Sequence, residues 1–257
     1  MSQYADIIYD VERGVATITI NRPQVLNAFT QDTIYEIEAA MKAAESDRSV
    51  GVVVLTGIGD RAFCVGGDIH WEKDGGLERE EYNIDKMIVE SAKPYIARIN
   101  GYAIGGGHHM AYFCDLSVAA EHAIFGQVGP KVGSPASGYF VNHLANIVGH
   151  KRAREMWMLC QRYTAAQALD WGLVNAVVPM AELDFKVRSY ADELLAKSPT
   201  CLRLVKASFR DHMNHIMKRD MHSFVRENAP NYFASGEANE GHSAFLEKRQ
   251  PDFGRWR

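Results

Sequence analysis

The fold of this chain is decided by the stretch PYIARINGYAIGGGHH, residues 94–109. Its first part, Pro94 to Asn100, has the apolar and β-branched character of a buried strand, and Gly101 ends that strand. Three glycines, Gly105 to Gly107, then open a helix-like segment from His108 to Cys114. A buried strand followed by a tight junction and a helix is the unit of α/β folds with crossover connections.

The same alternation extends in both directions along the chain. Val50 to Thr56 is a continuous β-branched run, typical of a strand covered on both faces of a parallel sheet. Thr30 is a suitable cap for a helix over Gln31 to Ala44. Further strands are predicted at Asp6–Asp10, Gly14–Ile20, Leu116–Ala120 and Ala123–Phe125. The fold class predicted from these patterns is α/β.

Helical patterns dominate from Gly138 onward, and strands are not predicted beyond about Val178. The predicted helices are Tyr139–Ile147, Lys151–Leu159, Thr164–Trp171, Glu182–Lys197 and Cys201–Asn228. No repeat or low-complexity linker separates two halves of the chain. We therefore interpret the C-terminal part as a helical layer of the same domain.

The composition is that of a soluble globular protein. The chain has 257 residues, of which 47% are hydrophobic and 23% charged, and its net charge is -4. A chain of this length buries enough surface to fold without disulfides or a structural metal. The cysteines lack CxxC spacing and are expected to be reduced, mostly buried thiols of a cytoplasmic protein; they are Cys64, Cys114, Cys160 and Cys201.

Several classes of function are excluded by what the sequence lacks. The N-terminus has no basic start with an apolar run, and no stretch of 18 apolar residues occurs. A pI of about 6.2 does not suit a general nucleic-acid binder. Motifs for nucleotide phosphates, zinc proteases, calcium loops and serine hydrolases are missing. We expect no membrane, nucleic-acid or metal partner.

Two glycine-rich junctions are the candidate chemical features, one at Cys64 to Asp68 and one at Gly105 to His109. At each, a main-chain N–H at the start of a helix can face a developing negative charge. Two such donors on one carbonyl oxygen form an oxyanion hole, worth about 3 to 4 kcal/mol per donor in the transition state. The alternative is that the glycines only permit tight turns with positive φ.

In order and spacing, five motifs resemble the crotonase (enoyl-CoA hydratase/isomerase) superfamily. They are NRP at 21–23, NAF at 27–29, AFCVGGD at 62–68, NGYAIGGG at 100–107 and CDL at 114–116. The resemblance implies a crotonase-like ββα superhelix in a single domain, residues 1–257. Its core would end near residue 195, and residues 196–257 would form a C-terminal helical trimerisation region. The family implies a homotrimer or homohexamer.

The resemblance also implies a coenzyme A thioester as substrate and no tightly bound cofactor. The N–H groups of Gly67 and Gly106 would hold the thioester carbonyl oxygen while an enolate forms beside it. Main chain around Val25, Leu26 and Ala28, and around Ala62 and Cys64, would cradle the adenine. Lys248 is a candidate contact for CoA or the acyl group, either in its own subunit or in a neighbouring one, and the alternative is a solvated charge. Because a chain that is negative overall must receive an anionic CoA, positive charge is expected locally, at Lys248 and Arg249.

Three further segments, at residues 125–134, 151–157 and 248–253, look most like two members of the superfamily. These are 1,4-dihydroxy-2-naphthoyl-CoA synthase and 2-ketocyclohexanecarboxyl-CoA hydrolase. Ordinary hydratases have glutamates where this chain has His109 and Gly129. The naphthoate-synthase type binds bicarbonate instead, and the corresponding residues here are Gln127, Gly129 and Trp157. For Trp157 the alternative is a plain core residue.

The chain departs from both relatives at two positions. Their aspartate two residues after Ser134 is Ala136 here, and their C-terminal tyrosine aligns with Phe233, so the hydroxyl is either lost or moved to Tyr232. The synthase also has basic residues to receive its substrate's carboxylate where this chain has His70 and Glu72. The inferred pocket is therefore poor in carboxylates.

Histidines and serines are what the inferred pocket offers for proton transfer, namely His70, His108, His109, Ser134 and Ser137. A histidine can act as base or acid near neutral pH. His109 lies three residues after Gly106, about one helical turn on, and is expected on the oxyanion side. His108 is then expected to be packed or facing solvent, and Ser134 is either a site or a turn residue.

The leading hypothesis is an enzyme that adds water to, or hydrolytically cleaves, a C–C bond in an alicyclic or aromatic-derived β-keto acyl-CoA. A second hypothesis is an enoyl-CoA hydratase or isomerase that uses His109 in place of glutamate. A third is a ring closure like that of naphthoate synthase, and a fourth is a CoA-binding scaffold without catalysis.

Overall fold

Two sheets form the core of the computed structural model, which describes residues 4–79 and 83–256. The larger sheet has the order β1-β2-β3-β5-β7-β10, with bounds Ile7–Glu12, Val15–Ile20, Val52–Gly57, Tyr95–Ile99, Leu116–Ala120 and Ala176–Val178. The smaller sheet has the order β4-β6-β8-β9, with bounds Ala62–Cys64, Tyr102–Ile104, Ile124–Gly126 and Arg162–Thr164. All neighbours pair in parallel except β1 with β2 and β8 with β9.

The chain visits the two sheets in turn, which confirms the predicted α/β, crotonase-like class. Each of the strands β3, β5 and β7 in the large sheet is followed by a short strand of the small sheet, β4, β6 and β8 respectively. Helices return the chain directly to the large sheet after the first two pairs, whereas the helices after β8 lead to β9 of the small sheet, and α9 then leads to β10. The three strand pairs, each followed by helices, form the ββα superhelix of the core.

Strand β3 shows why the large sheet is covered on both faces. Val53 and Leu55 belong to the main apolar cluster, which includes helix α1, whereas Val52 and Val54 pack with α10 on the other side. Successive side chains of a strand point to opposite faces, so an unbroken apolar run is what two covered faces require. All six residues of β3 are buried.

The helices account for most of the remaining chain. The helices α1 to α7 are Gln31–Ser46, Ile69–Lys73, Gly76–Arg79, Ile84–Glu90, Gly106–Phe113, Gly129–Val132 and Tyr139–Val148. The helices α8 to α13 are His150–Leu159, Ala165–Asp170, Leu183–Leu195, Pro199–Asn214, Met221–Asn228 and Glu237–Leu246. Short 3-10 turns lie at Pro23–Val25, Met180–Glu182, Phe233–Ser235 and Gly254–Trp256. The predicted cap of α1 is confirmed, because Thr30 and Thr33 form a reciprocal capping box.

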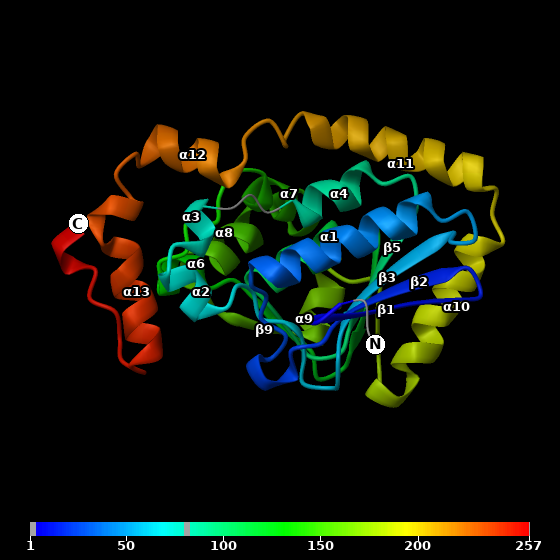
Figure 1. Ribbon diagram of the computed structural model, residues 1–257, viewed down its shortest axis with the longest axis horizontal. Helices are drawn as coiled ribbons and strands as arrows, with labels where there is room; N and C mark the ends of the chain where they lie inside the picture. The colour runs from blue at the N-terminus through cyan, green and yellow to red at the C-terminus, as the bar shows by residue number, and fades with distance from the viewer. Residues whose placement is uncertain (1–3, 80–82, 257) are drawn as a thin grey trace.

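The prediction of one continuous helix over Cys201–Asn228 is wrong. The segment forms α11, which ends at Asn214, and α12, which begins at Met221. Asp220 causes the restart, because its carboxylate accepts a hydrogen bond from the Ser223 N–H at 2.7 Å and so caps α12. In Figure 1 the helices α11, α12 and α13 run over one side of the core and turn down its end, towards α2 and α6.

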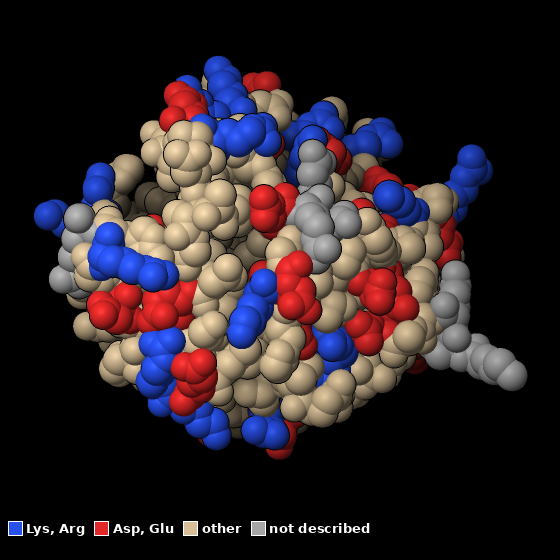
Figure 2. Space-filling model, turned by 60° about the vertical axis from the view of Figure 1, so that its left-hand side comes forward, with Lys and Arg blue, Asp and Glu red and all other residues tan. Residues whose placement is uncertain are grey.

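Charges of both signs are interspersed over the end of the molecule that carries these helices (Figure 2). Within residues 4–79 and 83–256, no helix is long and apolar enough to cross a membrane. All four cysteines are free, but the expectation that they are mostly buried holds for only two, Cys64 and Cys114. Cys160 is half-buried and Cys201 is exposed.

Candidate active site

Two adjoining cavities lie at the ends of β4 and β6. The outer cavity has a volume of 810 Å³ and the inner one 330 Å³. They share the lining residues Gly67, Glu72, Gly106, His109, Ser134 and Ala136. The shared wall contains both candidate oxyanion-hole glycines, so one ligand can extend from the outer cavity to the inner one past these residues.

The two glycine junctions meet because the strands before them are paired. Strand β4 pairs with β6 in parallel, and the junctions follow the carboxyl ends of these two strands. A Cβ atom placed on Gly66 would lie 3.2 Å from the N atom of Gly106. The glycines also serve the turns themselves, since Gly66 and Gly105 have φ of 97° and 54°, which favours glycine.

Among residues 4–79 and 83–256, the amide N–H groups of Gly67 and Gly106 have no acceptor and can act as donors. Phe29 forms an isolated bridge opposite Gly67, but it donates to the Gly66 carbonyl at 2.9 Å and accepts from the Asp68 N–H at 2.8 Å. In this parallel pattern the N–H of Gly67 itself points away from Phe29. Gly106 is the first residue of α5, where the N–H has no intrahelical partner and the helix dipole is positive.

The aromatic ring of Phe29 explains why residue 106 is a glycine. A Cβ on Gly106 would lie 2.7 Å from two ring carbons of Phe29. Phe29 is buried, lines the inner cavity and packs edge-on against Trp71 at 6.1 Å between ring centroids. Any side chain at position 106 would displace this ring, so the close approach excludes other residues.

His108 and His109 are linked through the amide of Gln127. The His109 Nε2 atom lies 3.2 Å from Gln127 Oε1, and Gln127 Nε2 lies 3.1 Å from His108 Nδ1. An amide oxygen only accepts and an amide nitrogen only donates, so His109 carries its proton on Nε2 and His108 accepts on Nδ1. Burial lowers the pKa of both imidazoles to about 3. Both rings are therefore neutral near pH 7.

His109 reaches the cavities as predicted, whereas His108 does not. His109 lines both cavities and stacks on Phe140 with 4.6 Å between ring centroids. His108 is completely buried behind it, edge-on to Tyr112 and Phe125. With its Nε2 proton bonded and its pKa far below neutrality, His109 is a weak base and a rigid part of the wall.

The residues predicted to bind bicarbonate lie in different surroundings, and bicarbonate binding stays a prediction. Gln127 and Gly129 line the outer cavity, but the Gln127 amide is bonded to both histidines. The ring centroids of His109 and Trp157 lie 5.4 Å apart. His109 therefore contacts both side chains that were predicted to donate to the anion, Gln127 and Trp157. A Cβ on Gly129 would lie 2.7 Å from the Ser134 carbonyl oxygen, so main chain fills the space beside it. Trp157 is buried core and its Nε1 has no hydrogen-bond partner in the described chain.

Ser134 and Tyr232, the two predicted hydroxyl groups, differ in position. Ser134 lines both cavities. Tyr232 is not among the lining residues of either cavity, and its hydroxyl donates to the Gly133 carbonyl at 2.6 Å. That bond holds the C-terminal layer against the loop before Ser134. Burial raises the pKa of Tyr232 well above its usual value.

Only part of the predicted CoA cradle lines the outer cavity. Val25, Leu26 and Ala28 do, and Phe245 and Leu246 of α13 lie on the same wall. Ala62 and Cys64 are buried outside the lining, where the Ala62 carbonyl accepts a hydrogen bond from the Asn27 side chain at 2.7 Å. Burial raises the pKa of the Cys64 thiol to about 12.

The positive charges at the outer cavity are not those predicted. Lys248 is exposed and outside the lining, and Arg249 forms ion pairs with Glu240 and Glu247, both at 2.6 Å. Arg61 and Arg162 line the cavity instead. They lie outside the motifs that mark the family, so only the folded chain identifies them.

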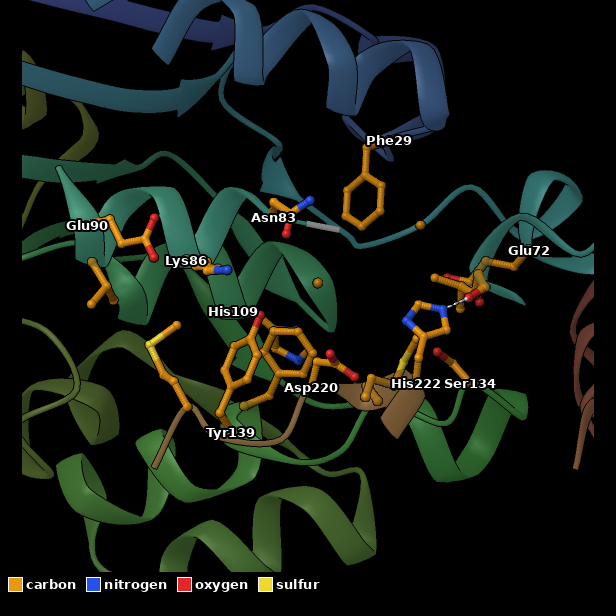
Figure 3. Close-up of a pocket in the computed structure, with 18 of the residues that line it drawn as sticks. Phe29, Glu72, Asn83, Lys86, Glu90, His109, Ser134, Tyr139, Asp220 and His222 are labelled. Atoms are coloured by element: carbon orange, nitrogen blue, oxygen red, sulfur yellow. Dashed lines mark hydrogen bonds between the residues drawn. The ribbon is translucent and has the colours of Figure 1, made fainter. Parts of the chain in front are cut away.

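The expectation of a site poor in carboxylates is wrong. Glu72 lines both cavities, and Glu90 and Asp220 line the inner one. Figure 3 shows the inner cavity with Glu72, Ser134 and His222 at one end and Lys86 and Glu90 at the other. Glu72 lies four residues after Asp68, which caps α2 by accepting from the His70 N–H at 3.0 Å. This helix after the GGD motif was the signal that could have placed Glu72 in the site.

The side chains of the described part of the chain do not gather into a metal site. Across residues 4–79 and 83–256, no group of three or more His, Cys, Asp or Glu side chains could hold a metal ion. At the wall that the two cavities share, the chemical groups are two amide donors, the Glu72 carboxylate, a neutral histidine and a serine.

Comparisons with known proteins agree with this geometry. The chain matches the enoyl-CoA hydratase/isomerase family over residues 10–255. An enoyl-CoA hydratase from Mycobacterium avium subsp. paratuberculosis K-10 is 30% identical, with a TM-score of 0.84 over 97% of this chain and 99% of that one. An enoyl-CoA hydratase subunit from Geobacillus kaustophilus HTA426 is 33% identical, with a TM-score of 0.75 over 98% and 99% of the two chains.

A third similar structure is methylmalonyl-CoA decarboxylase in complex with 2-nitronate-propionyl-CoA. It is 26% identical, with a TM-score of 0.87 over 97% of this chain and 98% of that one. None of these comparisons shows a special closeness to naphthoate synthase or to the ring-opening hydrolase. The glycine junctions, the superhelix and the match along nearly the whole chain together establish that this protein belongs to the enoyl-CoA hydratase/isomerase family.

Proposed function

We propose that this protein hydrolyses a C–C bond in a cyclic β-keto acyl-CoA by way of a thioester enolate. The observation that carries the proposal is the meeting of the Gly67 and Gly106 amides at one wall of two adjoining cavities. Two fixed donors stabilise an oxyanion more than they stabilise the ground-state carbonyl, which is how such a site lowers a barrier.

The two cavities suit the two parts of such a substrate. The outer cavity is larger, with apolar residues and two arginines on its wall, and would hold the CoA portion. The inner cavity combines Phe29, Tyr139 and Phe140 with the carboxylates and would hold a ring. In the reaction, water adds to the ring ketone, the C–C bond breaks towards the thioester, and the resulting enolate takes a proton at its α-carbon.

A hydratase or isomerase is the second candidate, because two of the similar structures are enoyl-CoA hydratases. The role of His109 as its base is weakened by burial, which lowers the pKa of His109 to about 3. Naphthoate-synthase-like ring closure is less well supported, since the negative charge of Glu72 at the cavity opposes a substrate carboxylate.

The test is an incubation of the purified protein with cyclic β-keto acyl-CoA thioesters and, separately, with straight-chain enoyl-CoA thioesters. Mass spectrometry is expected to show ring-opened product that has gained one water and, in deuterated water, one deuterium at the α-carbon. Conversion of the enoyl-CoA alone, abolished in His109→Ala, would establish the hydratase instead. Tight thioester binding without any exchange or turnover would favour the non-catalytic scaffold.

We also propose that the protein works as a trimer or a dimer of trimers. The support is the family, together with three exposed apolar side chains on α11, namely Leu204, Val205 and Phe209.

A further inference from the structure

Glu72 is the best placed proton-transfer group in the cavities, although neither the motif pattern nor the proposed bond cleavage assigns it a task. Its carboxylate lies directly over Gly67, so closely that a Cβ on that glycine would overlap Glu72 Oε1. Its side chain is 8% exposed, yet it lines both cavities. A carboxylate that is buried from bulk water but open to a cavity is available to a ligand.

The hydrogen-bonding of Glu72 is incomplete. Within the described residues its Oε2 atom has no hydrogen-bond partner, and neither do Nδ1 and Nε2 of His242. The two side chains face each other at 3.5 Å between Glu72 Oε2 and His242 Nε2, and the His242 side chain is only 5% exposed. Leaving a charged acceptor unsatisfied in a buried place is costly, so such a group in a cavity marks a site of function.

The pair joins two layers of the fold. Glu72 comes from α2, directly after the GGD junction, whereas His242 comes from α13 of the C-terminal layer. A Cβ on Gly241 would lie 2.6 Å from the Gly133 N atom, so α13 is pressed against the loop that leads to Ser134. Tight packing on both sides fixes His242 behind the carboxylate.

We propose that Glu72 is the general base and acid of this enzyme and that His242 is the residue that positions it. The proposal rests on the proposed enolate chemistry. With the thioester oxygen on the Gly67 amide, the α-carbon is one bond from the held carbonyl, beside the carboxylate that covers Gly67. His109, which bonds Gln127, then shapes the wall and does not transfer the proton.

Glu72 alone can accept and return the one proton that the hydrolysis transfers. Glu72 takes a proton from water as the water oxygen bonds to the ring ketone carbon. The C–C bond then breaks, and its electron pair becomes the thioester enolate held by the Gly67 and Gly106 amides. The Glu72 carboxyl returns its proton to the α-carbon, which regenerates the carboxylate. Overall, water and the cyclic β-keto thioester become an open-chain thioester that ends in a carboxylic acid.

The first measurement compares Glu72→Gln with the wild type in α-deuterium exchange and in turnover of the cyclic thioester. Glutamine keeps the shape but takes no proton, so both rates are expected to fall by about 100-fold or more. Binding of a non-reactive acyl-CoA thioether is expected to stay within about twofold. Glu78→Gln, whose exposed side chain is outside the linings of both cavities, is the matched control and should keep wild-type rates.

The outcomes separate the two proposals. A wild type that neither exchanges nor turns over any acyl-CoA overturns the proposed function. A wild type that is active while Glu72→Gln keeps at least half of both rates overturns the role of Glu72. A Glu72→Gln variant that loses thioether binding together with activity also overturns it, since the carboxylate would then be structural.

The role of His242 has its own readout. His242→Phe is expected to lower kcat while KM stays unchanged, because the histidine holds Glu72 and not the substrate. His242→Gln, which can still donate to the carboxylate, is expected to restore part of the lost kcat. An equal change in KM for both variants, or no rescue by glutamine, would contradict the positioning role.

Discussion

Burial determines what the histidines of this site can do. His108 and His109 follow the glycine junction on the first turns of α5, and both side chains are buried. A protonated ring there would lose its hydration and gain no counter-ion, which is why the pKa of each falls to about 3. The negative charge of Glu72 is consequently not matched by either of these rings.

The same burial predicts a loss of stability in acid. A histidine in the unfolded chain titrates near pH 6.5, so below that pH the unfolded state binds protons that folded His108 and His109 do not. The contribution of the two rings to the free energy of unfolding is complete above pH 6.5. It declines as the pH falls towards 3, by about 1.4 kcal/mol per pH unit for each ring. His108→Asn keeps an acceptor for Gln127 and cannot titrate.

Urea unfolding at a series of pH values checks this expectation. Between about pH 6 and pH 5, the free energy of unfolding should fall with decreasing pH less steeply in His108→Asn than in the wild type. The difference between the two slopes should be about 1.4 kcal/mol per pH unit. Equal slopes for the two proteins would show that His108 is protonated in the folded state.

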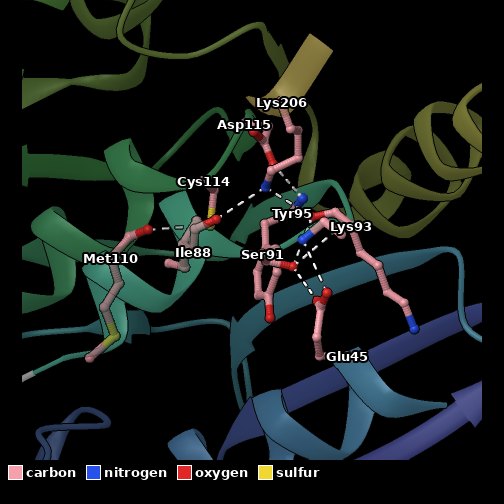
Figure 4. Close-up of polar contacts among 10 residues, drawn as sticks. Glu45, Ile88, Ser91, Lys93, Tyr95, Met110, Cys114, Asp115 and Lys206 are labelled. Atoms are coloured by element: carbon pink, nitrogen blue, oxygen red, sulfur yellow. Dashed lines mark hydrogen bonds and ion pairs between the residues drawn. The ribbon is translucent and has the colours of Figure 1, made fainter. Parts of the chain in front are cut away.

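A buried lysine attaches the C-terminal layer to the core at the level of secondary-structure elements. Lys206 of α11 donates to the Ile88 carbonyl at 3.1 Å, the Lys93 carbonyl at 2.9 Å and the Asp115 carboxylate at 2.8 Å. Figure 4 shows these partners around its ammonium group. Asp115 in turn accepts from the Tyr95 N–H at 2.7 Å, so α11, α4 and β5 meet at one charged centre.

Lys206→Met is therefore expected to destabilise the protein by about 2 to 4 kcal/mol, since it removes the cationic donor that Asp115 and two carbonyls share and leaves the Asp115 carboxylate without its counter-ion. Chemical unfolding gives the value. The matched control is Lys42→Met: the Lys42 side chain is 70% exposed, so the loss of its 3.9 Å pair with Glu38 should cost under about 1 kcal/mol. Similar losses in the two variants would mean that Lys206 does not anchor α11.

The predicted and the observed secondary-structure elements differ mainly in the shortest strands. Long segments with clear periodicity, such as α1 and β3, agree with the sequence patterns to within a few residues. The strands β4, β6, β9 and β10 were missed, because three residues show little period, although β8 has the same length and overlaps the predicted strand Ala123–Phe125. Two of them, β4 and β6, are nevertheless the strands that bring the two glycine junctions together.

For the whole molecule, the C-terminal layer completes the site. It contributes Phe245 and Leu246 to the outer cavity, Asp220 and His222 to the inner one, and His242 behind Glu72. On its outward side, Phe209 is 67% exposed and shares α11 with the exposed Leu204 and Val205. Apolar surface of this kind is typical of an interaction face.

Sedimentation velocity of the wild type is expected to show an assembly of three or six copies. Phe209→Asp is expected to shift the assembly towards the monomer, because a carboxylate cannot be buried in an α11 interface without a partner. Phe185→Asp on α10, where the phenylalanine is 77% exposed, is the matched control for an exposed aromatic residue outside α11. A monomeric wild type would contradict the proposed assembly, and an unchanged Phe209→Asp assembly would exclude α11 from the interface.

The sequence by itself determined the fold class, the family and the two glycine junctions, because these depend on local patterns and on the residues that tight turns and close approaches permit. Only the tertiary structure decided which side chains surround the junctions. It buried His108, moved the charge at the outer cavity to Arg61 and Arg162, and set Glu72 against Gly67 with His242 behind it. These contacts join segments far apart in the chain, so their formation depends on strand pairing and helix packing that no local pattern specifies.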